Sequence, residues 1–174
     1  MLFLLALTGC SKDEAGNDSD APVPVRFEAG SPEVFNLSAS LAQTAECPAG
    51  GFSVWVPDHF EEVQIDPLFD PDMCFYWHGK KLAVQGYATF QGDVALSDLF
   101  QVLTGYETES GYQYINDREM LYTRTEEFGR VRISYTWMNN EYSVTLEFTY
   151  AAEEASVQKT VDQIINSITF DNTY

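Results

Sequence analysis

Two neighbouring segments near the C-terminus alternate apolar and polar residues, and this pattern constrains the fold more than any other feature of the sequence. Residues 131–138 carry Val, Ile, Tyr and Trp at every second position, and residues 142–150 carry Tyr, Val, Leu, Phe and Tyr in the same way. A period of two is typical of a strand with one buried face. Asn139 and Asn140 separate the segments, and Asn tolerates the positive φ angles of a two-residue hairpin turn. The sequence therefore predicts an antiparallel hairpin over 131–150.

Further short apolar or alternating segments predict more strands, each bounded by turn residues. These segments are 52–56 (before Pro57), 73–77, 81–90, 112–115 and 119–125. The turns expected between neighbouring strands are His78–Lys80, Asn116–Asp117 and Phe128–Gly129.

Helical spacing occurs in two places. Leu96, Leu99, Phe100 and Leu103 fall on one face, which predicts a helix with Asp93 as N-cap and Gly105 as its stop. Residues 153–168 predict a C-terminal helix whose apolar stripe consists of Val157, Val161, Ile164, Ile165 and Ile168.

A third helix is indicated by Ser31-Pro32-Glu33, because proline is favoured at the first helical position. The fold class that follows is α+β, an antiparallel sheet of about six to seven strands packed with helices. The sequence is 45% hydrophobic and 14% aromatic, enough to bury a substantial core.

The N-terminus points to export. Residues 1–9 are apolar and uncharged, yet a bilayer span needs about 20 apolar residues, so this segment fits a signal peptide. Leu7-Thr8-Gly9-Cys10 resembles the lipobox of bacterial lipoproteins, which implies cleavage before Cys10 and lipidation of its thiol. No basic residue precedes Leu2, which departs from the usual signal pattern.

The acidic segment that follows is expected to act as a disordered tether. Residues 11–25 have no aromatic residue and little that could pack, so 10–25 is interpreted as lipidated cysteine plus tether, and 26–174 as a single α+β domain. Of the net charge of −18, the tether carries −3 and the domain −15. Nine Lys and Arg residues spread along the chain argue against nucleic acid and anionic lipid as partners.

With Cys10 assigned to lipidation, two cysteines are left, Cys47 and Cys74. An even number of cysteines in an exported chain favours a disulfide between them. If the strands around Ser53 and Phe75 formed a simple hairpin, however, Cys74 would lie opposite the end of the first strand that is far from Cys47. The sequence leaves the disulfide open.

The order of elements resembles the PsbP-like superfamily, and with the lipobox it is similar to the DcrB-like bacterial lipoproteins. The resemblance rests on "GFSVWVPDHF", "LSDLFQVL", the meander of strands and "TVDQIINSITF", and it covers about residues 51–170. It implies a compact sheet–helix sandwich that binds protein more often than it catalyses a reaction. No functional residue is carried over from it.

Catalytic and metal-binding groupings are sparse. The only histidines, His59 and His78, are not near a Gly-x-Ser-x-Gly motif and are expected at the surface. Asp66, Asp70 and Asp72 could begin a Ca²⁺ site, but they lack the spacing of known calcium loops, and Asp-Pro pairs commonly form turns.

Aromatic residues supply another candidate binding surface. Trp55 lies on the polar side of its strand, and Tyr76 and Trp77 follow in a neighbouring strand, with Tyr87 close in sequence. Exposed Trp and Tyr residues are common binding anchors. They could equally be covered by a helix or by residues 26–46.

We therefore expect a non-catalytic binding module without a cofactor, anchored to a membrane through Cys10. It would face outward from the cytoplasm in the bacterial cell envelope, at the outer or plasma membrane, and engage an envelope protein through a sheet face or the loop 58–72. Ser11 is not the aspartate that retains lipoproteins at the inner membrane. The alternative is a lipoprotein that binds a small ligand, either a glycan or Ca²⁺.

Overall fold

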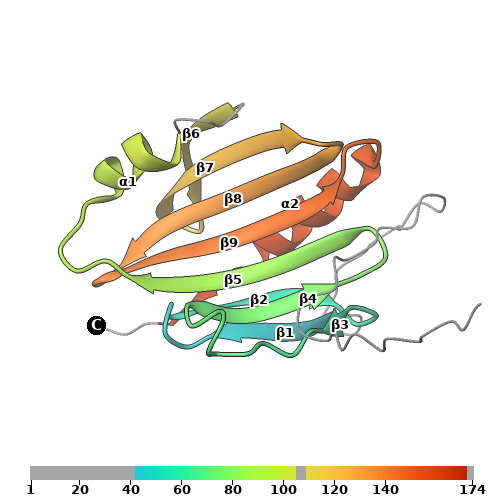
Figure 1. The fold of residues 1–174 in the computed structure, drawn as a ribbon, viewed down its shortest axis with the longest axis horizontal. Helices are drawn as coiled ribbons and strands as arrows, with labels where there is room; N and C mark the ends of the chain where they lie inside the picture. The colour runs from blue at the N-terminus through green and yellow to red at the C-terminus, as the bar shows by residue number, and fades with distance from the viewer. Residues whose placement is uncertain (1–41, 105–108, 172–174) are drawn as a thin grey trace, which may run out of the picture.

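The computed structural model describes residues 42–104 and 109–171, which form two antiparallel sheets and two α-helices (Figure 1). The strands are β1 (Ala42–Cys47), β2 (Phe52–Pro57), β3 (Glu61–Glu62), β4 (Met73–His78), β5 (Leu82–Phe90), β6 (Glu109–Ile115), β7 (Arg118–Glu127), β8 (Arg130–Asn139), β9 (Tyr142–Ala151) and β10 (Thr169–Phe170). The helices are α1 (Leu96–Leu103), the short 3-10 helix η1 (Ala155–Val157) and α2 (Gln158–Asn166).

Several predictions fall on residues 1–41, outside the described residues. They are the signal peptide 1–9, the lipidated Cys10, the tether 11–25 and the helix beginning at Ser31. Gly105, the expected stop of the first helix, also lies outside.

Seven strands form the larger sheet, in the order β3-β4-β5-β9-β8-β7-β6. The hairpin predicted over 131–150 is confirmed, with Val131 opposite Tyr150 and Trp137 opposite Val144. Its turn residue Asn140 has a φ of 53°. The turns at Asn116–Asp117 and Phe128–Gly129 also have the positive φ angles that suit two-residue hairpins.

The smaller sheet has three strands in the order β1-β2-β10. The strand predicted at 52–56 is confirmed as β2, but β2 pairs with β1 and β10 and has no partner in the larger sheet. The strand β1 was not predicted, because its inward positions are only Ala45 and Cys47, which give a weak apolar signal.

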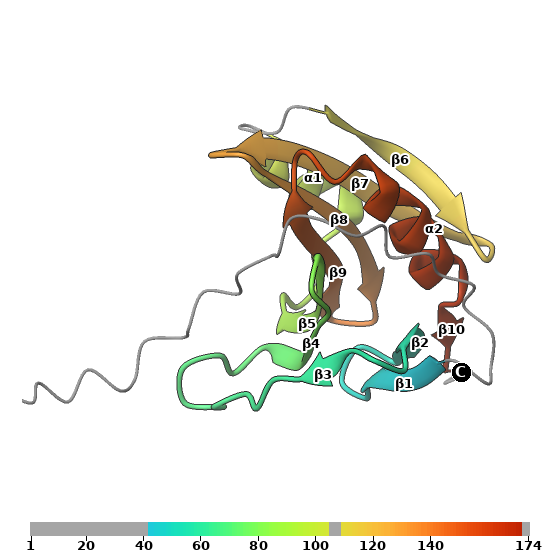
Figure 2. The same cartoon turned by 90° about the vertical axis from the view of Figure 1, so that its right-hand side faces the viewer.

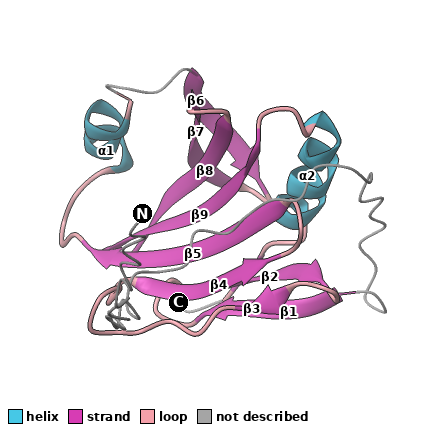
Figure 3. Cartoon of the chain, turned by 45° about the vertical axis from the view of Figure 1, so that its right-hand side comes forward, coloured by secondary structure: helices cyan, strands magenta, loops and turns pink. Residues whose placement is uncertain are grey.

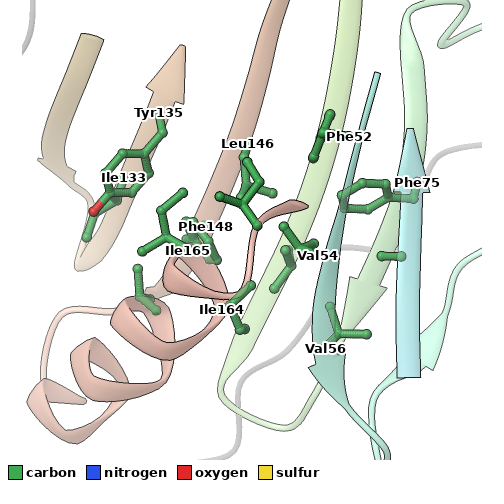
Figure 4. Close-up of a cluster of buried hydrophobic side chains, with 14 of the residues drawn as sticks. Phe52, Val54, Val56, Phe75, Ile133, Tyr135, Leu146, Phe148, Ile164 and Ile165 are labelled. Atoms are coloured by element: carbon green, nitrogen blue, oxygen red, sulfur yellow. The ribbon is translucent and has the colours of Figure 1, made fainter. Parts of the chain in front are cut away.

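The core lies between the two sheets and α2 (Figure 2). The whole predicted stripe of the C-terminal helix is buried, namely Val157, Val161, Ile164, Ile165 and Ile168. Figure 4 shows side chains from β2, the larger sheet and α2 meeting there, including Val54, Leu146 and Ile164. Gly86 allows Phe75 to lie over β5, because a Cβ at Gly86 would come within 2.4 Å of its ring.

Both helices differ from their predicted limits. α1 begins after Ala95, whose side chain makes no capping hydrogen bond, so the prediction of Asp93 as N-cap is wrong. The C-terminal helix ends near Ser167, whose hydroxyl donates to the Ile164 carbonyl at 2.6 Å and accepts from the Trp55 amide at 2.9 Å. Ser167 therefore ends the helix and joins it to the smaller sheet. In the described residues, no helix is long and apolar enough to cross a membrane.

Cys47 and Cys74 form a disulfide in the structure, with their Cα atoms 5.0 Å apart. The simple hairpin that made this pairing difficult does not form, because β2 turns back along β1 and not along β4. The bond therefore links β1 in the smaller sheet to β4 in the larger one.

Candidate functional site

The two faces of the seven-stranded sheet differ in character. One face carries the core. The other, which we call the outer face, carries mainly polar and aromatic side chains, because successive residues of a strand point to opposite sides. One row in register across it consists of Tyr112, Leu121, Thr136, Thr145 and Tyr87. Thr136 and Thr145 hydroxyls lie 3.0 Å apart and form a hydrogen bond.

α1 covers one part of the outer face. Its Phe100 ring stacks on Tyr112 of β6, with ring centroids 5.3 Å apart and an interplanar angle of 21°. α1 also contacts β7, where Leu121 is buried outside the main core. Figure 3 shows α1 and α2 at opposite sides of the molecule. In Figures 1 and 3, α1 lies away from β4 and β5, and Tyr76 and Tyr87 lie on the outer face of these two strands.

Tyr76 and Tyr87 lie in a partly desolvated, charged neighbourhood. Burial raises the pKa of Tyr87, and the negative charges of Glu147 and Asp70 add to this, against the opposing effect of Arg132. Burial also raises the pKa of Tyr76, opposed by Arg130. Both phenols therefore stay protonated at neutral pH and can donate as well as accept hydrogen bonds.

An ion pair lies beside these tyrosines. Arg132 Nε is 3.6 Å from Glu147 Oε1, and the Arg132 side chain is mostly exposed while Glu147 is largely covered. An exposed guanidinium at such a position can bond a partner without losing much of its contact with Glu147.

The loop between β3 and β4, residues 63–72, holds two large apolar side chains in solvent. Leu68 is 88% exposed and Phe69 is 75% exposed. Asp66 shapes this tip, because its Oδ1 accepts from the Leu68 amide at 2.9 Å and its carbonyl accepts from the Phe69 and Asp70 amides at 3.0 Å. The exposure of Leu68 and Phe69 is thus built into a hydrogen-bonded turn.

The loop is tied to the sheet beside the tyrosines. The Ala88 amide donates to the Asp72 carbonyl at 2.8 Å, and the Val63 amide donates to the Tyr76 carbonyl at the same distance. We call this combined area the loop–sheet surface and define it by the residues Leu68, Phe69, Asp70, Tyr76, Tyr87, Arg132 and Glu147. The loop 63–72 contains three Asp residues and no Lys or Arg, and the preceding residues 58–62 add three more acidic residues, so the loop side of the surface is strongly acidic.

The three aspartates predicted as a Ca²⁺ site take part in the hydrogen bonds of the loop 63–72. Asp66, Asp70 and Asp72 are all exposed, and their backbone carbonyls accept the hydrogen bonds that hold the loop. Within 42–104 and 109–171, no group of three His, Cys, Asp or Glu side chains is arranged to hold a metal ion. The structure therefore does not bring these three carboxylates together as a ligand set.

The three predicted aromatic residues do not form one surface. Trp55 is 38% exposed on β2 of the smaller sheet. Tyr76 lies on the outer face of β4, while Trp77, the next residue, faces inward and packs against the core. The alternation along β4 was sufficient to separate Tyr76 from Trp77 in advance. The exposure of Leu68 and Phe69 had no signal in the sequence beyond the neighbouring Asp-Pro pairs.

The two histidines lie on different elements. His59 is exposed after β2, with Nδ1 3.5 Å from Asp58 Oδ1. His78 is half-buried at the end of β4, with its ring centroid 6.4 Å from that of Tyr76. His78 therefore borders the loop–sheet surface, and His59 does not belong to it.

Comparison with solved structures defines the fold as PsbP-like. The cyanobacterial PsbP (CyanoP) of Synechocystis matches with a TM-score of 0.57 at 9% identity, covering 82% of this chain and 98% of that one. A crystal structure from Bacteroides thetaiotaomicron matches with a TM-score of 0.56 at 12% identity, covering 76% of this chain and half of that one. The Ran-binding protein Mog1p of Saccharomyces cerevisiae matches with a TM-score of 0.49 at 9% identity, covering 76% of this chain and 96% of that one.

No family model matches the sequence. No curated protein matches it either. The structural likeness therefore establishes the α+β, PsbP-like fold of the chain, and its function must be argued from its own surface.

Proposed function

We propose that this chain is an exported, lipid-anchored and non-catalytic binding module of the bacterial cell envelope. Its loop–sheet surface engages a partner protein that offers a basic patch around an apolar pocket. The observation that carries the proposal is the pair of exposed apolar residues, Leu68 and Phe69, on an acidic loop fixed beside Tyr76 and Tyr87.

The chemistry of the surface favours a protein over a small ligand. Tyr and Arg are enriched among residues that dominate binding energy, and an apolar anchor inside a polar rim is typical of protein interfaces. The acidic loop would attract Lys and Arg residues and repel other acidic surfaces, which gives specificity and faster association. Leu68 and Phe69 would then fill the pocket at the centre.

The second part of the proposal is a lipid anchor at Cys10. Cleavage before Cys10 and lipidation of its thiol would hold the folded part near a membrane through the segment 11–25. Metabolic labelling with a radioactive fatty acid should mark the chain, and the label should disappear in the Cys10→Ser variant. Labelling that persists in that variant would contradict the anchor.

Photo-crosslinking in the native cell envelope tests the partner. A benzophenone amino acid replaces Phe69 in one strain and Phe128 in a second strain. Phe128 is the matched control, because it is also an aromatic residue fully exposed at a turn, but it lies in the turn between β7 and β8. We expect a discrete protein adduct from position 69 and none from position 128.

Binding measurements with the isolated adduct partner give the magnitude. Phe69→Ser should weaken the affinity by roughly 30-fold, the effect of removing a binding anchor worth about 2 kcal/mol. Asp70→Asn should weaken it less and should reduce its dependence on salt. Equal adducts from positions 69 and 128, or no adduct from either, would refute the loop–sheet surface as the binding site.

A further inference from the structure

A second interaction site is suggested by β6, which forms one edge of the seven-stranded sheet. Its seven residues pair with β7 in unbroken register, and within the described residues no strand pairs with its other side. The opposite edge strand, β3, has two residues. Natural proteins commonly protect long edges with proline, lysine or a bulge. The β6 sequence, ESGYQYI, has none of these.

The turn after β6 fixes which backbone groups face outward. Asn116 and Asp117 have φ angles of 48° and 64°, so they form a two-residue hairpin turn. In such a hairpin the flanking pair, Ile115 and Arg118, is hydrogen-bonded, and the pairs alternate from there. The amides and carbonyls of Ser110, Tyr112 and Tyr114 therefore point away from β7. All three residues are exposed.

α1 adds an apolar wall beside this edge. Its Phe100 stacks on Tyr112, and none of its residues is buried although the helix is largely apolar. Val102 and Leu103 are exposed on α1. Side chains of a strand added to β6 would alternate between the two faces of the sheet, and those on the outer face would meet this wall.

The exposed charges around the edge have one sign. Within α1, β6, the turn to β7 and the first two residues of β7, they are Asp98, Glu109, Asp117 and Glu119. The one basic residue at this turn, Arg118, is half-buried with its guanidinium 4.0 Å from the centre of the Phe170 ring. A segment that pairs with β6 is therefore favoured when it carries Lys or Arg.

We propose that β6 is a strand-addition site that takes an extended, basic segment of another protein. The added strand would hydrogen-bond to Ser110, Tyr112 and Tyr114 and extend the sheet by one strand. The strand β4, to which the loop 63–72 is tied, is five strand spacings from β6, about 24 Å, and Arg132 on β8 is the residue of the loop–sheet surface nearest to β6, two spacings away. The strand-addition site uses backbone groups of β6 and does not depend on the loop–sheet surface.

Amide exchange in the full-length chain labelled with nitrogen-15 tests the proposal. The first probe is an acetylated nine-residue peptide of alternating Lys and Val. The second has the same sequence with every backbone amide methylated, which keeps the charge and removes the donors. We expect the first peptide, at millimolar concentration, to slow exchange at Ser110, Tyr112 and Tyr114 at least tenfold. The second should leave these rates unchanged.

A variant provides the second comparison. Tyr112→Pro removes an outward amide without breaking a bond to β7, and it should abolish the effect of the peptide on Ser110 and Tyr114. Equal effects of the two peptides on wild-type chain would overturn the proposal, because charge alone would then explain binding. No slowing at millimolar peptide would also overturn it. Slow amide exchange in β6 without any peptide, in a chain that sediments as a dimer, would overturn it too, because a second copy of the chain would then occupy the edge.

Discussion

The disulfide between Cys47 and Cys74 joins the two sheets, and its removal has a calculable effect. The two residues are 27 positions apart. On the chain-entropy model, a closed loop of this length lowers the entropy of the unfolded chain enough to stabilise the fold by about 3.6 kcal/mol. Cys47 is fully buried in the core, so replacement by alanine would add a packing loss that reduction does not. Reduction of the native chain therefore isolates the effect of the bond.

The assay is urea denaturation of the Cys10→Ser chain, with and without a reducing agent, followed by tryptophan fluorescence. With an m-value of about 2 kcal/mol per M, the loss corresponds to a decrease of about 1.8 M in the urea midpoint. Mass measurement of alkylated protein, before and after reduction, reports the number of free thiols. A midpoint that moves by less than about 0.5 M would refute the reasoning, as would two free thiols in the unreduced chain.

Three further predictions concern stability. The Lys81 and Glu154 side chains are 5% and 13% exposed and lie 2.8 Å apart, so Glu154→Gln should cost about 3 kcal/mol in urea denaturation. The double variant Lys81→Met and Glu154→Leu should recover most of that loss in the free energy of unfolding. A double variant that loses as much as the two single variants Lys81→Met and Glu154→Leu together would contradict this. Phe128→Asn should raise the melting temperature, because Phe128 has a φ of 51° and Asn adopts this conformation at about 1 kcal/mol lower cost; an unchanged or lower melting temperature would contradict the turn argument. Burial raises the pKa of both Tyr87 and Tyr135 above the ordinary value, so the stability they contribute is present below pH 10 and is lost as the pH rises further. Absorbance titration should show these two phenols ionising with or after alkaline unfolding, and a full tyrosine titration in the folded chain would contradict it.

The larger sheet could be predicted because its pattern is local. Alternation over 131–150 and the asparagines between the strands specify a hairpin without any knowledge of the rest of the chain. The stripe of the C-terminal helix is equally local, and its burial was predicted correctly.

The smaller sheet could not be predicted in the same way. β10 has two residues, and β1 presents Ala45 and Cys47 to the core, so neither has a distinctive period. Both strands exist because β2 offers them hydrogen bonds, which is a tertiary effect.

The loop–sheet surface was also only partly predictable. The sequence predicts the loop 58–72 as a surface for an envelope protein, with Asp66, Asp70 and Asp72 as an alternative Ca²⁺ site, but it does not reveal that Leu68 and Phe69 are exposed. Which side of a turn faces solvent depends on hydrogen bonds such as the one from Leu68 to Asp66, and composition does not reveal them.

The pairing of β10 with β2 has a consequence for the order in which the chain can fold during its synthesis. Thr169 lies opposite Ser53, and the Trp55 amide bonds to the Ser167 hydroxyl across 112 positions. A chain that is synthesised from its N-terminus therefore keeps one edge of β2 unpaired until residues 167–170 have appeared. The smaller sheet is completed only after all seven strands of the larger sheet have been synthesised, and until then one edge of β2 is open to non-native pairing.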